Sequence, residues 1–225
     1  MHPDRTDRCY WHLKLLLNKL QSIVDSDLLE AGEKILDYGC GNKPYRSLFE
    51  MKFREYVAAD LPGNKHCDIV IGPNGQLPVE KDSFDCVLSS EVLEHTIDPY
   101  SYLRESYRVI KPGGSLVLSA PAIWVYHPHP VDYWRWTIDG LQHQISLAGF
   151  EIVTVKGVFG PESMALQLWQ DSTFYRLPNW FQPLYTWFFQ ILIWLIERRH
   201  PDKLSEDASI YIVLARKPTE IISDN

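Results

Sequence analysis

The feature that most constrains the fold is a regular alternation of short apolar runs with longer segments of helical character. The apolar runs lie at residues 34–39, 55–60, 68–71, 84–89, 115–120, 150–155 and 209–215. The central runs are continuously apolar, which is typical of strands that are buried on both faces of a sheet. Because strands and helices alternate, the pattern predicts an α/β fold with a doubly wound, Rossmann-like, mainly parallel sheet and helices on both faces.

Local signals mark the ends of two expected helices. Asp98 is a favourable N-cap and is followed by a proline at the first helical position. Pro112 and Gly113 are expected to end that helix. A second helix is expected from the capping residue Thr137 to Gly149. Both helices fall between predicted strands, as a doubly wound sheet requires.

Two segments extend beyond this alternation. Residues 1–30 include an N-terminal segment in which apolar residues recur at helical spacing. Residues 161–207, between the sixth and the last strand, form an insertion that is rich in Trp, Phe and Pro. We therefore predict one α/β domain, made of residues 31–160 and 208–218, that carries both additions.

Charge and cysteine content narrow the class of partner and the cellular setting. The chain has 22 Lys and Arg against 29 Asp and Glu, a net charge of −7, whereas binding to nucleic-acid phosphates needs a basic face. The four cysteines form no CxxC pair and no zinc-type spacing, so we expect reduced thiols in a cytoplasmic protein. The first residues do not resemble a secretory signal. Clustered carboxylates with a metal-binding spacing are missing, so we expect no metal.

The segment ILDYGCGNKPY, residues 35–45, predicts a strand that runs directly into a ligand-binding turn. Gly39 and Gly41 lack a β-carbon, so the backbone can approach a ligand closely at the carboxyl edge of the sheet, where ligands of such folds bind. Asp60 ends the next strand about twenty residues later, where a carboxylate can accept hydrogen bonds from ribose hydroxyls. The turn therefore predicts a ligand that contains a nucleoside.

The same turn favours S-adenosylmethionine (SAM) over a dinucleotide. A pyrophosphate needs a third glycine and an open helix N-terminus, but Pro44 and Tyr45 occupy that place. SAM carries no phosphate, and Asp37 would lie close to the ammonium group of SAM or to a water molecule bound to that group. A nicotinamide-dependent dehydrogenase is therefore the disfavoured alternative.

Five segments in this order resemble the motifs of class I SAM-dependent methyltransferases that act on small molecules. They are residues 35–45, 56–61, 77–95, 107–121 and 147–155. The resemblance covers about residues 33–156 and the last strand. It implies a seven-stranded sheet whose last strand is antiparallel and enters between the fifth and the sixth, with SAM as the cofactor.

The resemblance also implies cofactor-binding roles, residue by residue. Asp37, Gly39, Cys40 and Gly41 match the SAM turn, Asp60 matches the ribose carboxylate, and Leu61 matches an apolar contact to adenine. Ser89, Ser90, Glu91 and His95 match the segment that lines the methionine part. Many relatives place an acid where Pro73 stands here, so Asn74 or Gln76 is expected to reach the adenine amine instead. His95 is either a base or a residue that fixes the loop.

Residues 126–137, YHPHPVDYWRWT, follow the fifth strand and are expected to lie over the methyl group. They resemble the H-x-x-P-x-D-[FY]-x-R-[FYW]-T loop of a methyltransferase subgroup found among enzymes of glycan and lipopolysaccharide biosynthesis. A hydroxyl acceptor loses a proton as the new bond forms, and a histidine oriented by an aspartate suits that task. The candidate catalytic residues are His127 or His129, with Asp132.

The same loop supplies the expected acceptor site. Its aromatic faces can support sugar rings, and Arg135 can hold a carboxylate or a phosphate. The candidate substrate-binding residues are Tyr126, Tyr133, Trp134 and Arg135. Two alternatives stay open, because Arg135 can pair with Asp132 instead and the aromatic residues can simply pack the loop onto the sheet.

These patterns predict a SAM-dependent methyltransferase, with a hydroxyl of a sugar or glycan intermediate as the first acceptor hypothesis. A quinone-like or lipid acceptor and a non-catalytic SAM-binding regulator are the alternatives. The apolar run at residues 184–196 is too short to span a bilayer. We expect the insertion to be a lid or a helix of a homodimer interface, and the alternative is peripheral membrane contact through residues 180–200.

Overall fold

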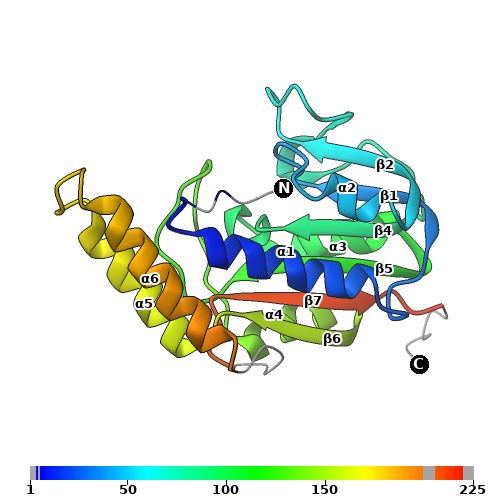
Figure 1. Ribbon diagram of the computed structural model, residues 1–225. Coiled ribbons are helices and arrows are strands. Elements are labelled where there is room, and N and C mark those ends of the chain that lie inside the picture. Colours follow the sequence, from blue (N-terminus) through cyan, green and yellow to red (C-terminus); the bar gives the residue numbers. More distant parts are fainter. Residues whose placement is uncertain (1–3, 5, 200–205, 220–225) are drawn as a thin grey trace.

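The computed structural model describes residue 4, residues 6–199 and residues 206–219 (Figure 1). At its centre lies a seven-stranded sheet with the strand order β3-β2-β1-β4-β5-β7-β6. The strands are β1 (Gly32–Tyr38), β2 (Phe53–Asp60), β3 (Ile69–Val70), β4 (Phe84–Ser90), β5 (Ile110–Pro121), β6 (Glu151–Val158) and β7 (Ile210–Arg216). β7 is antiparallel to β5 and β6, and the other neighbours are parallel. The predicted fold class is confirmed, including the antiparallel last strand.

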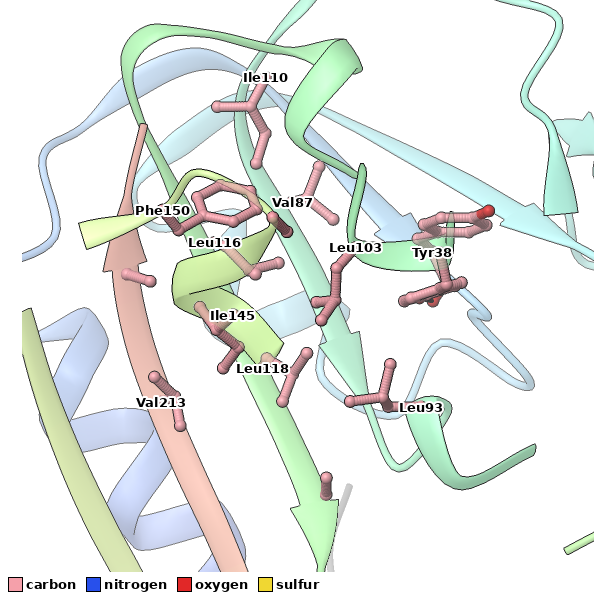
Figure 2. Packing of buried hydrophobic residues seen from close by; sticks show 14 of the residues in the cluster. Tyr38, Val87, Leu93, Leu103, Ile110, Leu116, Leu118, Ile145, Phe150 and Val213 are labelled. Atoms are coloured by element: carbon pink, nitrogen blue, oxygen red, sulfur yellow. Dashed lines mark hydrogen bonds between the residues drawn. The ribbon is translucent and has the colours of Figure 1, made fainter. Parts of the chain in front are cut away.

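Helices cover both faces of this sheet. α3 (Pro99–Val109) and α4 (Ile138–Leu147) pack on one face, and α1 (Tyr10–Val24) and α2 (Arg46–Phe49) pack on the other. Successive residues of β4 therefore alternate between two apolar cores. Val87 lies in the core beneath α3 and α4, shown in Figure 2, whereas Cys86 and Leu88 lie in the core beneath α1. This burial on both faces explains why the central strands are continuously apolar.

The predicted helix caps are confirmed. The Asp98 carboxylate accepts hydrogen bonds from the backbone N–H groups of Tyr100 and Ser101, at 3.1 and 3.2 Å. The Thr137 hydroxyl accepts one from the N–H of Gly140 at 3.1 Å. These bonds satisfy N–H groups that have no partner within the first turn of a helix.

The structure differs from the predicted pattern in the length of two strands. β3 contains only two residues, and β5 begins at Ile110, before the apolar run that predicted it. α3 ends at Val109, so it stops before Pro112 and Gly113 rather than at them. Within β5, a β-carbon on Gly114 would lie 2.7 Å from the Asp85 carbonyl oxygen. Glycine at this position therefore lets the first part of β5 lie close to β4.

The predicted insertion contains a helical hairpin, α5 (Pro161–Phe174) and α6 (Gln182–Glu197), beside α1 at one end of the molecule (Figure 1). The amide of Gln190 donates to the Arg8 carbonyl at 2.6 Å and accepts from the Trp11 N–H at 3.1 Å. Arg8 also forms an ion pair with Asp171 at 2.7 Å. The hairpin is therefore bonded to the N-terminal segment. Residues 200–205, near the predicted end of the insertion, lie outside the described residues.

The hairpin region carries several exposed apolar side chains. They are Trp169, Tyr175, Trp180, Leu184, Trp187, Phe188 and Leu195. No helix in the described parts of the chain is both long and apolar enough to cross a membrane. Surface contact with a membrane through residues 180–200, or with a second copy of the chain, stays a prediction.

We expect the double variant Trp187→Ser, Phe188→Ser to weaken any such contact, because both side chains of α6 are more than half exposed. Light scattering of the two proteins would report a dimer that becomes a monomer. Co-sedimentation with liposomes would report loss of lipid binding. A variant that matches the intact protein in both assays would show that these two side chains have neither role.

Candidate functional site

The turn after β1 adopts the conformation that its glycines allow. Gly39 has a φ of +91° and Gly41 a φ of +50°, both in the left-handed region that favours glycine. The N–H groups of Gly39 and Cys40 both donate to the Ala59 carbonyl, at 2.9 and 3.0 Å. A β-carbon on Gly39 would lie 2.5 Å from a methyl group of Val92. The turn is therefore held between the end of β2 and the segment that follows β4.

Asp60, at the end of β2, closes the same turn. One carboxylate oxygen accepts a hydrogen bond from the Gly41 N–H at 2.9 Å, and the other accepts one from the Leu61 N–H at 2.7 Å. Asn64 also donates to this carboxylate. Leu61 is 47% exposed beside it. The predicted ribose carboxylate and the predicted adenine contact are thus neighbours at the carboxyl edge of the sheet.

Asp37 and Cys40 form the inner wall of the turn. The Asp37 carboxyl is buried and accepts a hydrogen bond from the Tyr56 hydroxyl, and burial raises its pKa to about 7. Cys40 is buried with its sulfur 3.8 Å from an Asp60 oxygen, and burial raises the pKa of this thiol to about 12. Cys40 is therefore a neutral packing group, whereas Asp37 changes charge near neutral pH.

Two of the other predicted cofactor residues lie in a loop beyond β3. Asn74 and Gln76 are exposed around the short 3-10 helix η1 (Pro73–Gly75). The Tyr38 hydroxyl donates to the Gly75 carbonyl and ties this loop to the end of β1. The contact of Asn74 or Gln76 with adenine stays a prediction.

Ser89 and Ser90 point in opposite directions. Ser89 is fully buried, and its hydroxyl accepts a hydrogen bond from Tyr102 of α3 at 2.9 Å. Ser89 therefore packs in the core and does not line an open crevice, contrary to the expectation for both serines. Ser90 lies 2.9 Å from the Ser119 hydroxyl of β5, and Ser119 donates to Glu91 at 2.8 Å. Burial, together with the nearby charge of Glu94, raises the pKa of Glu91.

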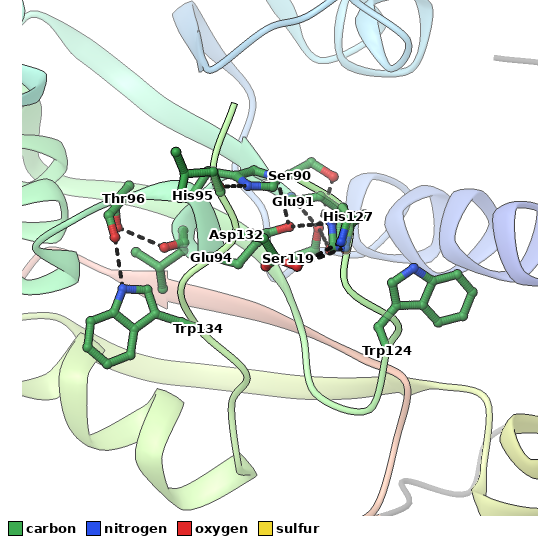
Figure 3. Close-up of polar contacts among 12 residues, drawn as sticks. Ser90, Glu91, Glu94, His95, Thr96, Ser119, Trp124, His127, Asp132 and Trp134 are labelled. Atoms are coloured by element: carbon green, nitrogen blue, oxygen red, sulfur yellow. Dashed lines mark hydrogen bonds and ion pairs between the residues drawn. The ribbon is translucent and has the colours of Figure 1, made fainter. Parts of the chain in front are cut away.

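Glu94 is a site residue that the sequence reasoning did not single out. It lies in the short 3-10 helix η2 (Leu93–His95) after β4, is fully buried, and neither carboxylate oxygen has a hydrogen-bond partner among the described residues. The Nε2 atoms of His95 and His127 each lie 3.6 Å from its Oε1 atom (Figure 3). We call these three residues the Glu94 cluster. Its only sequence signal is the position of Glu94 between Glu91 and His95 in the same motif.

His127, and not His129, takes the predicted place beside an acid. The Glu94 carboxylate, which faces its Nε2, raises the pKa of His127. His129 is exposed, and no hydrogen bond or ion pair of its ring is found within the described chain. Asp132 also lies beside the ring, with its Oδ2 atom 3.5 Å from Nδ1, and an orienting role of this carboxylate stays a prediction. Asp132 accepts the backbone N–H of His127 at 2.9 Å, whereas the ring Nδ1 faces the Val125 carbonyl at 3.0 Å.

Arg135 forms an ion pair with Asp132. This pairing is one of the two alternatives that the sequence left open. Its two terminal nitrogens lie 2.5 and 2.6 Å from the two Asp132 oxygens. It also donates to the carbonyls of Trp124, Val125 and Trp134. Arg135 also lowers the pKa of Asp132 through these bonds. Within the structure this arginine therefore stiffens the loop, and its predicted role as an anion-binding group would require the pair to open.

Three further bonds fasten the loop to the segment that carries Glu94. The N–H of Tyr133 donates to the Glu94 carbonyl at 2.8 Å, and the indole of Trp134 donates to the Thr96 carbonyl at 2.8 Å (Figure 3). His95 Nδ1 lies 2.6 Å from the Val131 carbonyl. The loop covers Glu94 and still presents Tyr126, which is 72% exposed, and about half-exposed Tyr133 and Trp134.

An open, mostly apolar pocket of about 860 Å³ lies beside this loop. Its lining includes Trp124 and Val125, which lead into the loop, and Leu168, Trp169 and Tyr175 of the hairpin region. The Arg8–Asp171 ion pair contributes the charged part of the wall. The loop therefore connects the Glu94 cluster with an apolar space that is bounded by α5.

Comparisons with known proteins agree with this geometry. A family model described as "Methyltransferase domain" matches residues 11–155. A Mycolicibacterium smegmatis protein named "Probable S-adenosylmethionine-dependent methyltransferase" is 27% identical over 150 residues, 60% of this chain and 58% of that protein. A Ruegeria pomeroyi ubiquinone biosynthesis O-methyltransferase is 30% identical over 173 residues, 63% of this chain and 68% of that protein.

Among solved structures, the Burkholderia thailandensis 1,6-didemethyltoxoflavin-N1-methyltransferase resembles this fold with a TM-score of 0.57 and 17% identity, over 90% of this chain and 78% of that one. This likeness concerns the fold alone. The chain spans less than two thirds of the mycobacterial relative, and the family model covers more than half of the chain. The chain therefore belongs to the SAM-dependent methyltransferase-domain family, and its cofactor is SAM.

Proposed function

We propose that the protein transfers a methyl group from SAM to a hydroxyl oxygen of a small-molecule acceptor. The observation that carries this proposal is the buried Glu94 carboxylate against the half-buried His127 ring, next to the strand end where Ser90 and Glu91 lie. An acid and a base in this place serve an acceptor that must lose a proton. An acceptor atom that is already nucleophilic without loss of a proton would need neither.

The transfer itself requires little more than alignment. SAM supplies a methyl group on a positively charged sulfur, and the acceptor oxygen must lie in line with the bond that breaks. Much of the acceleration then comes from holding both partners in a dry site. The Asp132–Arg135 pair and the bonds to the Glu94 segment hold the loop rigidly enough for that task. His127 would receive the hydroxyl proton through Nε2.

For the acceptor we propose a sugar or glycan intermediate first. The exposed faces of Tyr126, Tyr133 and Trp134 around the loop suit the apolar faces of sugar rings. A quinone-like or lipid acceptor is the second candidate. It is supported by the apolar pocket beside Trp124 and by the likeness to a ubiquinone biosynthesis O-methyltransferase.

Incubation with methyl-labelled SAM and fractionated host extract would test the function. Label in water-soluble or lipid-linked sugars would support the first acceptor class. Label in quinones or simple lipids would support the second. SAM binding without label in any fraction would instead support a non-catalytic SAM-binding regulator.

The affinity for SAM is expected to rise with pH up to neutrality. Burial raises the pKa of Asp37 to about 7, so the carboxyl is mainly protonated below that pH. If Asp37 pairs with the SAM ammonium group, binding requires its ionised form and releases a proton. The dissociation constant should then fall by up to about tenfold per pH unit as pH approaches 7, and level off above it.

Calorimetric titration with SAM over this pH range would measure the effect. Asp37→Asn keeps the size of the side chain and removes its titration, so this variant should bind more weakly and with little dependence on pH. A wild-type affinity that does not change with pH would contradict the assigned pairing.

A further inference from the structure

The three side chains of the Glu94 cluster converge although they come from separate parts of the chain. Glu94 and His95 lie in η2 after β4, and His127 lies in the loop after β5. One ligand-type atom from each of the three lies within 4.8 Å of the others. The two Nε2–Oε1 distances of 3.6 Å are too long for good hydrogen bonds. The three groups therefore face a common point without bonding to one another.

The backbone determines which ring nitrogens face this point. His95 Nδ1 lies 2.6 Å from the Val131 carbonyl, and His127 Nδ1 lies 3.0 Å from the Val125 carbonyl. A carbonyl oxygen only accepts hydrogen bonds, so these contacts assign the ring proton to Nδ1. For His127, the carbonyl at 3.0 Å is closer than the Arg135 nitrogen that lies 3.4 Å from the same Nδ1. In the neutral rings, each Nε2 then presents a lone pair toward Glu94. A histidine that binds a metal ion through one ring nitrogen usually donates a hydrogen bond from the other, often to a backbone carbonyl.

Three acceptors that face one another need a positive charge between them. A buried carboxylate without hydrogen bonds is costly unless it is paired or binds a metal. Arg135 is nearby, but its guanidinium is bound by both oxygens of Asp132. A proton on His127 Nε2 would pair with Glu94 and leave the lone pair of His95 Nε2 without a partner. A metal ion would satisfy all three groups at once.

We propose that Glu94, His95 and His127 bind a divalent first-row transition-metal cation. Bonds of about 2.1 Å from a cation to imidazole nitrogen and to carboxylate oxygen place neighbouring ligands about 3.0–3.5 Å apart. The two 3.6 Å distances to Glu94 therefore need little change, and the two imidazoles start within 4.8 Å of each other. Two imidazoles and one carboxylate favour cations such as Mn²⁺, Co²⁺ or Zn²⁺ over Mg²⁺ or Ca²⁺. The His127 side chain is 27% exposed, which leaves a side from which a cation and further oxygen ligands can enter.

This site would sharpen the chemistry of the proposed function, on which its catalytic role rests. A cation lowers the pKa of a bound hydroxyl, so the acceptor oxygen can release its proton to water. The oxygen lone pair then forms the O–CH₃ bond as the C–S bond breaks, and the sulfur keeps that electron pair. The cation keeps its oxidation state. In this arrangement His127 is a metal ligand, and the cation takes over the task of activating the hydroxyl.

The site can be tested without any acceptor. Untagged protein treated with EDTA would be titrated with Mn²⁺, Co²⁺ and Zn²⁺ by calorimetry, and thermal unfolding would be followed with and without each cation. We expect one site for at least one of them, and an increase in Tm on binding. Glu94→Gln keeps the shape of the side chain and should weaken binding at least tenfold. His143→Ala, on the exposed side of α4, is the matched control and should bind as the wild type does.

Several outcomes overturn the site. Absence of binding by the EDTA-treated wild type would do so, and so would equal binding by wild type and Glu94→Gln. If Glu94→Gln does not fold, as judged by circular dichroism, His95→Gln replaces it with the same expectation. A labelled-methyl assay then separates the two proposals. Cation binding without methyl transfer would uphold the site and refute the proposed function, whereas full transfer by the EDTA-treated protein would refute the catalytic role of the cation.

Discussion

Replacement of His127 by Ala is expected to lower kcat by about 10²–10⁴-fold while the dissociation constant for SAM stays the same. The ring lies against Glu94 in the loop after β5, whereas the groups predicted to bind SAM lie at the ends of β1 and β2. Both proposed roles of His127, as base and as metal ligand, act on the acceptor hydroxyl. The expected loss therefore falls on turnover and not on cofactor binding.

The measurement is a steady-state assay with labelled SAM, accompanied by calorimetric titration with SAM. His129→Ala is the informative comparison, because His129 lies two residues further along the same loop and is exposed. We expect it to lose far less activity. Equal losses in the two variants would indicate a general effect on the loop and would contradict a specific role of His127.

Replacement of Gly39 by Ala should destabilise the protein by about 2–4 kcal/mol and weaken SAM binding. A β-carbon at this position meets Val92 at 2.5 Å, in a turn whose φ is +91°. The new methyl group therefore adds a steric clash to an unfavourable backbone conformation. Relief of the clash requires movement of the turn or of the segment between β4 and Glu94, and both border the site.

Gly41→Ala is a matched control two residues away. Gly41 also has a positive φ, of +50°, but no atom lies within 4 Å of a β-carbon built on it. Gly41→Ala should therefore lower the free energy of unfolding by only about 1–2 kcal/mol, the cost of the left-handed backbone conformation for alanine. Urea unfolding of the wild type and both variants measures the difference. Equal shifts of the unfolding midpoint would contradict the role assigned to the Val92 contact.

The elements that were predicted well depend on residues close together in the chain. The caps at Asp98 and Thr137 and the glycine turn are set by backbone requirements within a few residues, so sequence alone shows them. The continuous apolar runs located the strands because burial on both faces removes polar residues from them. The boundaries of β3 and β5 were less accurate, because pairing with neighbouring strands decides where a strand begins.

The side chains that were predicted poorly depend on orientation. Ser89 and Ser90 are adjacent in β4, and successive side chains of a strand point to opposite faces, so only one of them can face the crevice. The sequence indicated only part of the surroundings of His127: Asp132, predicted as its partner, does lie 3.5 Å from Nδ1. In the folded loop Arg135 also binds Asp132, and a second acid that the sequence did not indicate, Glu94, faces the other nitrogen of the ring.

The sequence by itself determined the order of strands and helices, the SAM turn with Asp60 at its edge, and the membership in a methyltransferase family that these motifs indicated. Only the tertiary structure decided which ionisable groups meet. Glu94 and His127 are far apart in the chain, and the contact between them forms because β4 and β5 are neighbours whose following segments lie at the same edge of the sheet. The bonds from the loop to Thr96 and to the Glu94 carbonyl then bury a carboxylate that, in the sequence, looks like any surface acid.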